Sequence, residues 1–290
     1  MKKTISIIIA LLMMTIPYVL TTAALAEDGS ILFRDDLDGG IQTTKASDSE
    51  LNLMKTYLLN QYNNTLNSNR LIDNNMGYLF ALKGIQYAIN KTAYGTGGNQ
   101  VDCSKLVHNS LLASYEEKNL SDYYPFGSRK SSQGQYNDCV SFGLAVTINR
   151  NADKPLANLK TGDLVFWCNP STGKVNHVGL FLKYNGENYV IEAIPNCAVV
   201  SKIWENDNYI FKAYARLNTA KTATFKTAAP FNESLGTQKV LYNCPPSPPT
   251  PPSHSGYIFI NWSPSVANGM TSNKTYTANY QARANIAAKK

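Results

Sequence analysis

Apolar residues recur at intervals of three and four positions in the first half of the chain, a spacing that predicts amphipathic helices. A capping box at Ser47 to Glu50, in which a serine and a glutamate cap each other's backbone N–H groups, opens the first helix. Further helices are expected over residues 76–90 and 103–117, and the Asn-rich residues 63–75 are expected to form a loop.

Short apolar runs separated by turn residues follow from residue 164 onward, and they predict β-strands. Residues 177–183 and 188–193 flank Asn185-Gly186, the dipeptide that most strongly marks a two-residue hairpin turn. Further strands are expected at residues 164–167, 199–204 and 209–216. Helices first and antiparallel strands second predict an α+β domain in which helices pack on an antiparallel sheet.

Two stretches depart from this pattern. Residues 118–158 are polar and irregular, and we interpret them as an insertion with a short helix near residues 140–146. Residues 218–290 contain six prolines between Pro245 and Pro252, which taken alone indicate a stiff, extended linker. Strand-like patches on both sides of the prolines instead predict a small β-rich module, with strands at residues 222–225, 240–243, 257–262 and 276–280.

Residues 1–26 have the layout of an export signal. Two lysines precede an apolar run over residues 5–16, and Ala24-Leu25-Ala26 is a small-x-small cleavage site. The run is shorter than the roughly 20 residues of a membrane-spanning helix. We therefore expect an exported protein without a membrane span, in which residues 27–75 form a helical lead-in.

Composition narrows the classes of function. The 290 residues carry a formal net charge of +7, but no dense run of Lys and Arg indicates a nucleic-acid groove. The mild excess of positive charge suits an anionic surface. Only three histidines are present and no Cys-x-x-Cys occurs, so we expect neither a metal site nor a cofactor.

The chain has five cysteines, and an odd number in an exported protein leaves at least one thiol unpaired. Cys168 and Cys197 follow predicted strands on either side of the hairpin, so a disulfide between them is one hypothesis. Spacing alone leaves the pairing of Cys139 and Cys244 open.

Cys103 is the candidate nucleophile. A glycine-rich turn around Gly97-Gly98 precedes Cys103, which is expected in the first turn of the third predicted helix. The N–H groups and the partial positive charge of a helix N-terminus stabilise a thiolate, which is the nucleophilic form of cysteine. The alternative interpretation is a buried structural cysteine that packs like a small apolar residue.

A thiolate nucleophile requires a base within hydrogen-bonding reach, and the base requires a third group to orient it. His108 lies five positions after Cys103, which turns it about 140° away around the helix axis. His254 follows the proline-rich stretch, where a surface role is expected. His177, at the start of the first hairpin strand, is the candidate base.

Hairpin register links Glu192 to this histidine. A two-residue turn at Asn185-Gly186 makes the numbers of cross-strand partners sum to 371, so Glu192 faces Gly179 on the same side as His177. Glu192 can then accept a hydrogen bond from one ring nitrogen and leave the other for the thiol. The alternative interpretation is an exposed strand carboxylate. The opposite face carries a predicted core of Val178, Leu180, Leu182, Tyr189 and Ile191.

Four motifs together resemble the NlpC/P60 family of papain-like cell-wall cysteine peptidases. They are Tyr94-x-x-Gly97-Gly98, Asp102-Cys103-Ser104, Gly162-Asp163-Leu164-Val165-Phe166-Trp167 and Asn176-His177-Val178-Gly179. The resemblance covers residues 76–217 and implies a papain-like NlpC/P60 fold. It also implies that Cys103 is the nucleophile, that His177 is the base, and that the third polar residue falls on Glu192.

The same resemblance implies that Tyr94, Asp102 and Ser104 help to shape the substrate site. This chain departs from the family in three ways. Lys105 stands where a glycine is usual, the third residue is Glu rather than His, and the insertion is long. These departures bear on substrate preference more than on the chemistry.

The C-terminal segment has its own likeness. Residues 256–264 and 275–280 resemble the Listeria–Bacteroides type repeat of surface proteins, which implies a small β-grasp-like module. The resemblance implies surface attachment or a spacer role, with a cell-surface ligand as partner and no catalytic residues.

These observations divide the chain into an export signal (1–26), a lead-in (27–75), an NlpC/P60-like domain (76–217) and a β-rich module (218–290). The leading hypothesis is a secreted or wall-associated hydrolase that cleaves an amide of peptidoglycan stem peptides through Cys103, His177 and Glu192. One alternative keeps the site in an N-acetylmuramoyl-L-alanine amidase or an acyltransferase. Another is a catalytically inactive wall-binding adhesin.

Overall fold

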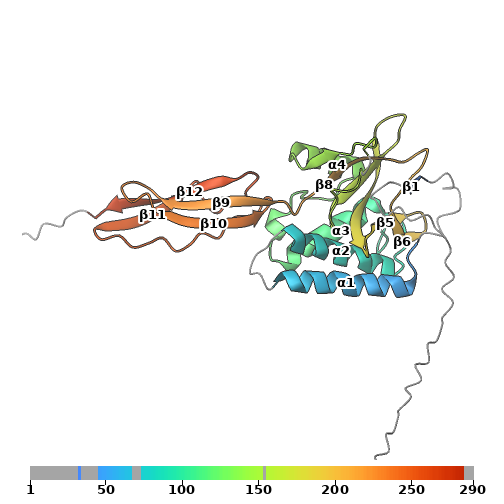
Figure 1. The fold of residues 1–290 in the computed structure, drawn as a ribbon, viewed down its shortest axis with the longest axis horizontal. Coiled ribbons are helices and arrows are strands. Elements are labelled where there is room, and N and C mark those ends of the chain that lie inside the picture. Colours follow the sequence, from blue (N-terminus) through green and yellow to red (C-terminus); the bar gives the residue numbers. More distant parts are fainter. Residues whose placement is uncertain (1–31, 34–44, 67–72, 153–154, 284–290) are drawn as a thin grey trace, which may run out of the picture.

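The computed structural model describes residues 32–33, 45–66, 73–152 and 155–283. The predicted export signal, residues 1–26, lies outside these ranges and stays a prediction. The described chain forms a mixed part of helices and strands, from which a long, narrow arm of strands extends (Figure 1). No helix within the described ranges is long and apolar enough to span a membrane.

Three consecutive helices precede the main sheet, as predicted: α1 (Asp48–Leu66), α2 (Asp73–Ile89) and α3 (Cys103–Glu117). The capping box is present, because the Ser47 N–H donates to Glu50 Oε2 at 2.8 Å and the Glu50 N–H donates to Ser47 Oγ at 3.3 Å. These two bonds satisfy N–H groups that the first turn of a helix cannot pair internally.

α1 extends further than the Asn-rich composition predicted. The expected loop over residues 63–75 is wrong at both ends, since the helix continues to Leu66 and α2 begins at Asp73. Near this end Tyr62 is buried, and its hydroxyl donates to Glu117 Oε1 of α3 at 3.2 Å. Tertiary packing of this kind overrides the weak helix preference of asparagine.

A six-stranded antiparallel sheet packs against these helices (Figure 1). Its strand order is β2-β8-β3-β4-β5-β6. Helices on an antiparallel sheet confirm the α+β prediction. The strands are β2 (Ala145–Thr147), β3 (Leu164–Cys168), β4 (Val175–Tyr184), β5 (Glu187–Ile194), β6 (Cys197–Lys202) and β8 (Ile210–Ala215). A short parallel pair, β1 (Leu32–Phe33) with β7 (Trp204–Glu205), lies outside this sheet.

The β4–β5 hairpin has the predicted register. Tyr184 pairs with Glu187 and Leu180 pairs with Ile191, so cross-strand partners sum to 371. The turn residues Asn185 and Gly186 have φ angles of 50° and 83°, as a two-residue turn of the primed type requires.

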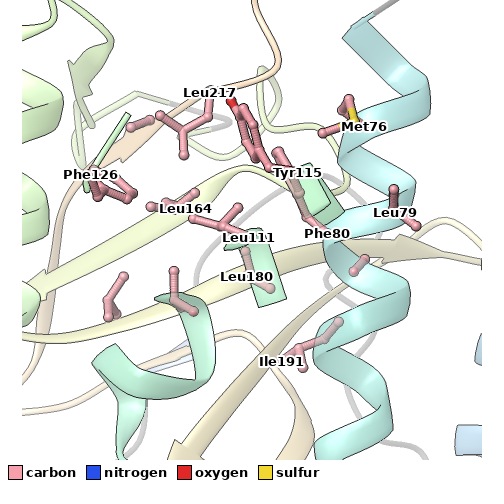
Figure 2. Packing of buried hydrophobic residues seen from close by; sticks show 14 of the residues in the cluster. Met76, Leu79, Phe80, Leu111, Tyr115, Phe126, Leu164, Leu180, Ile191 and Leu217 are labelled. Atoms are coloured by element: carbon pink, nitrogen blue, oxygen red, sulfur yellow. The ribbon is translucent and has the colours of Figure 1, made fainter. Parts of the chain in front are cut away.

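Both faces of the sheet are buried. The predicted core residues of β4 and β5 lie on the face that α2 and α3 cover, where Leu180 and Ile191 meet Phe80 and Leu111 (Figure 2). The other face is covered by loop residues and by the segment around Trp204. Its buried cluster comprises Ile148, Leu156, Leu159, Val165, Trp167, Phe181, Val190, Ile203, Trp204 and Phe211.

The stretch over residues 118–158 holds a short 3₁₀ helix (η2, Ser121–Tyr123), then α4 (Ser132–Ser141), then β2. The predicted helix at residues 140–146 is therefore misplaced. Ser131 caps α4 by accepting from the Gly134 N–H at 3.2 Å, and the β-branched residues beyond the helix pair with β8 instead.

The C-terminal arm is a four-stranded sheet of order β10-β9-β12-β11. Its strands are β9 (Ala220–Thr227), β10 (Ser234–Leu241), β11 (Tyr257–Ser263) and β12 (Lys274–Ala282). The central pair β9–β12 is parallel and each outer pair is antiparallel, an arrangement similar to a β-grasp sheet. The strand predicted at residues 240–243 overlaps only the end of β10. The likeness to a surface repeat stays a prediction.

Buried residues of the arm belong to the same apolar cluster as residues of α2 and α3, and two contacts from the 118–158 stretch add to this packing. Asn243 Nδ2 donates to the Tyr123 carbonyl oxygen at 3.1 Å, and the rings of Phe142 and Tyr242 lie 5.7 Å apart. Both contacts use the 118–158 stretch.

The hypothesis of a disulfide between Cys168 and Cys197 is wrong, since both thiols are free in the structure. Cys168 ends β3 and Cys197 begins β6, and β4 and β5 lie between them. Three inter-strand spacings separate the two residues by roughly 14 Å, which is far beyond the reach of a disulfide.

Gly162 provides a test of the packing between α2 and the turn before β3. Gly162 has a φ angle of +90°, and a Cβ atom there would lie 2.3 Å from the Cα of Gly77. Gly186 has a φ angle of +83° and open space around it. We expect Gly186→Ala to lower the free energy of unfolding by about 1 kcal/mol through backbone strain. Gly162→Ala adds overpacking of roughly 1–3 kcal/mol. Equal losses in urea unfolding would show that α2 does not pack tightly on the turn.

Candidate active site

Asp102 builds the N-terminus of α3 and thereby places Cys103. It is the N-cap residue with extended backbone angles, and its Oδ1 accepts from the Lys105 N–H and from Ser104 Oγ, both at 2.7 Å. Cys103 follows as the first helical residue and is 8% exposed. The sulfur therefore lies where a helix dipole favours negative charge.

Cys103 and His177 line one pocket, whose volume is about 270 Å³. The pocket is bounded by Tyr94, Cys103, Asn176, His177, Ala193, Ile194, Pro195, Trp204, Asn208 and Tyr209. His177 Nε2 lies 2.6 Å from Glu192 Oε2, which leaves Nδ1 as the ring nitrogen for the thiol. The structure thus brings together three residues that lie far apart in the sequence.

The imidazole of His177 holds its proton strongly. Burial by itself lowers the pKa of His177, but the charge and hydrogen bond of Cys103, followed by those of Glu192, outweigh burial and raise this pKa to about 10. The positive charge of the imidazolium therefore lies in the pocket that Cys103 also lines.

Glu192 is 0% exposed, which excludes the interpretation as an exposed strand carboxylate. Besides the contact with His177, Glu192 Oε1 accepts from Ser201 Oγ at 2.6 Å and from Trp204 Nε1 at 2.9 Å. Both carboxylate oxygens are thus hydrogen-bonded, as a buried charge requires. The carboxylate is fixed in position and can orient the imidazole.

Sequence reasoning missed Ser201 and Trp204. Ser201 pairs with Val190 across β5 and β6, so it lies on the same face as Glu192, and strand parity could have indicated it. Trp204 follows a break between β6 and β7. Its carbonyl oxygen accepts from Trp167 Nε1 at 2.7 Å, a contact between distant strands that no local pattern reveals.

Tyr94, Asp102 and Ser104 lie around the nucleophile in different settings. Tyr94 is 40% exposed and lines the pocket, and burial, followed by the charges of Cys103 and Asp102, raises the pKa of its hydroxyl. Ser104 is buried and bonds to Asp102. The second oxygen of Asp102 forms an ion pair with Arg129. These polar groups of Asp102 and Ser104 are engaged within the protein.

α4 contacts both halves of the candidate site, and sequence reasoning missed this role too. The buried Gln135 donates through Nε2 to the Ser104 carbonyl oxygen at 2.8 Å. Gln133 Oε1 accepts from the Val175 N–H at 2.7 Å, two positions before His177 in β4. The stretch interpreted as an insertion is therefore hydrogen-bonded to the first turn of α3 and to the start of β4, and it holds both in position.

The other two histidines stand apart from Cys103. His108 Nδ1 lies 2.9 Å from the Tyr124 hydroxyl, and burial, followed by the charge of Arg129, lowers the pKa of His108. This confirms the prediction that His108 is a poor partner. His254 is more enclosed than predicted, because its ring stacks on Phe231 at 3.5 Å. Over the described ranges, no group of His, Cys, Asp and Glu could hold a metal ion.

One family model matches part of the chain. Residues 91–218 match the model of the NlpC/P60 family. Two crystal structures of an N-acetylmuramoyl-L-alanine amidase from Bacteroides uniformis ATCC 8492 are similar. One is 15% identical, covers 49% of this chain and 98% of its own, and has a TM-score of 0.36. The other is 16% identical, covers 48% and 98%, and has a TM-score of 0.34. No curated protein matches.

The titration of His177 tests the geometry directly. With only three histidines in the chain, NMR can assign His177 as the ring resonance that disappears in His177→Gln. We expect it to titrate near pH 10, and to titrate at lower pH in Glu192→Gln because a carboxylate that favours the imidazolium is lost.

Glu187→Gln is the matched control for this titration, since Glu187 lies on the same strand but bonds to Lys202 and Tyr189. It should leave the His177 titration unchanged. A His177 that titrates near its ordinary pH of about 6.5 in the unaltered protein would contradict a close contact with Cys103 and Glu192.

Gln135→Leu tests the bracing by α4. Loss of the Nε2 donor removes one of two hydrogen bonds to the Ser104 carbonyl oxygen, which keeps its intrahelical bond, and costs about 1 kcal/mol of folding free energy. We expect the alkylation rate of Cys103, followed by peptide mass spectrometry, to fall several-fold. Gln133→Leu should affect His177 and β4 more than Cys103. An unchanged Cys103 rate in Gln135→Leu, with the chain folded, would exclude a positioning role for Gln135.

Proposed function

We propose that the protein is a peptidoglycan hydrolase that cleaves an amide bond in the wall's stem peptides, because residues 91–218 match the model of the NlpC/P60 family. The observation that supports this most is the buried Glu192 bonded at 2.6 Å to His177 Nε2, with Cys103 in the same pocket. Residues 1–26 export the chain, and it acts outside the cell or at the wall.

Acylation forms the first intermediate. The Cys103 thiolate attacks the carbonyl carbon of the amide and a tetrahedral oxyanion results. N–H groups in the first turn of a helix lack intrahelical acceptors, so the N–H of Cys103 can donate to this oxyanion. As the intermediate collapses, the C–N bond breaks, His177 gives its proton to the leaving amine and a thioester remains on Cys103.

Deacylation returns the enzyme to its starting state. Neutral His177 takes a proton from water, the resulting hydroxide attacks the thioester, and the C–S bond breaks. The products are a carboxylic acid and the Cys103 thiolate, with the proton back on His177. Glu192 keeps the ring oriented and stabilises the imidazolium, which loses its proton in acylation and re-forms once in each turnover.

The size and lining of the pocket indicate what it accepts. A volume of about 270 Å³ suits one amino-acid residue and its amide rather than a sugar chain. Asn176, Asn208 and two tyrosines supply polar contacts, whereas Glu192 is buried behind His177 and inaccessible to substrate. Tyr94, partly exposed at the edge, contacts the stem peptide.

Digestion of defined muropeptides tests the proposal. We expect the purified exported chain to release products with a new amine and a new carboxyl terminus inside the stem peptide, identified by mass spectrometry. Cys103→Ala should lower the rate by more than about 10⁴-fold while the melting temperature stays within a few degrees.

Product masses also separate the alternatives. New termini between muramic acid and L-alanine would assign the same site to amidase chemistry, and transfer to an added amine would assign an acyltransferase. Binding to the wall without any cleavage, or full activity of Cys103→Ala, would contradict the proposed thiol mechanism.

A further inference from the structure

A second pocket lies at the other end of β4. It has a volume of about 270 Å³, similar to that of the candidate active site. Its lining comes from α1, α2, the turn before β3 and the end of β4: Tyr57, Tyr78, Leu159, Lys160, Thr161 and Lys183. Lys183 lies six positions after His177 on β4, so the two pockets are roughly 20 Å apart.

The pocket carries positive charge, and no carboxylate in its lining neutralises this charge. Lys160 and Lys183 are exposed, and no carboxylate lines the pocket. Lys160 lies within electrostatic reach of the buried Asp163. However, Asp163 accepts from Arg216 at 2.8 and 2.7 Å and from the Lys160 backbone N–H at 2.8 Å, so its oxygens are occupied. In the described part of the chain, neither lysine ammonium forms an ion pair.

Neutral donors converge on the same space. Thr161 Oγ1 accepts from the Lys183 N–H at 3.1 Å, which leaves its own hydroxyl proton free to donate. Burial, followed by the charge and hydrogen bond of Tyr57, raises the pKa of Tyr78. The Tyr78 hydroxyl therefore keeps its proton and can act as a hydrogen-bond donor. Ammonium and hydroxyl donors in a pocket with no carboxylate in its lining favour an oxyanion.

The walls of the pocket are fixed before any ligand arrives. A Cβ atom on Gly77 would lie 2.3 Å from the Thr161 carbonyl oxygen, so α2 touches the turn through its backbone. The bidentate bond between Arg216 and Asp163 anchors the same turn to β8. A preformed site needs little reorganisation when a ligand binds, so little binding free energy is lost.

We propose that this second pocket binds a carboxylate or phosphate group carried on a cell-wall polymer. The site holds the polymer while an amide roughly 20 Å away lies at Cys103, and a second attachment of this kind raises the local concentration of substrate. The identity of the polymer rests on the proposed function, whereas the preference for an oxyanion rests on the pocket alone.

Binding is measured in the Cys103→Ala background, where cleavage cannot interfere, by co-sedimentation with purified wall sacculi. The double variant Lys160→Gln with Lys183→Gln, called the pocket pair below, removes both ammonium groups of the pocket. The double variant Lys91→Gln with Lys226→Gln, called the control pair, removes two exposed positive charges elsewhere and is the matched control. We expect the pocket pair to weaken apparent affinity about tenfold and the control pair less than twofold. Equal losses in both pairs, or no loss in the pocket pair, would overturn the proposal.

Two kinds of sacculi distinguish the sources of the oxyanion. Treatment with hydrofluoric acid strips phosphodiester-linked polymers and leaves the carboxylates of peptidoglycan. Pocket-dependent binding that persists on stripped sacculi assigns the ligand to carboxylates, and binding that disappears assigns it to phosphates. Thermal melting of each variant shows that the chain remains folded.

A second readout separates this proposal from the hydrolase proposal. With Cys103 restored, the pocket pair should lower the rate on sacculi but leave kcat/KM unchanged on a short soluble muropeptide, which cannot span both pockets. A chain that binds sacculi through the lysines without cleaving any muropeptide would refute the hydrolase and keep the oxyanion site. An equal loss of rate on both substrates would refute a separate site.

Discussion

The buried hydrogen bond between Glu192 and His177 is the interaction on which the rest of the site depends. A carboxylate with no solvent contact is tolerated only where partners fill both of its oxygens, and His177, Ser201 and Trp204 do so. The same bond orients the imidazole toward Cys103. Removing either residue would leave the other buried without its hydrogen-bond partner. The same bond therefore contributes to both the stability of the fold and the orientation of the imidazole.

Much of this arrangement could be predicted because it follows from local rules. The turn at Asn185-Gly186 fixes the hairpin register, and the register determines which side chains share a face. His177 and Glu192 could therefore be related from the amino-acid sequence. The Ser47 capping box and the bounds of α3 follow from side chains adjacent in sequence. Strand alternation identified the core face of β4 and β5.

What could not be predicted depends on contacts between distant segments. Composition did not indicate that a contact of Tyr62 with α3 would keep the end of α1 helical. The polar sequence of α4 likewise did not indicate that Gln133 and Gln135 would form hydrogen bonds to the candidate site. The proposed bridge between Cys168 and Cys197 failed because their strands are separated by two others, and strand order is a property of the whole sheet. Trp204 reaches Glu192 only after the chain leaves β6.

The most direct test of the proposed thiol mechanism is the rate at which a stem-peptide chloromethyl ketone labels the protein. This reagent reports both the nucleophilicity of Cys103 and its access to a bound stem peptide. We expect labelling at Cys103 alone among the five cysteines, slowed at least about tenfold in Glu192→Gln. Labelling at another cysteine, or an unchanged rate in Glu192→Gln, would show that the buried carboxylate does not control the thiol.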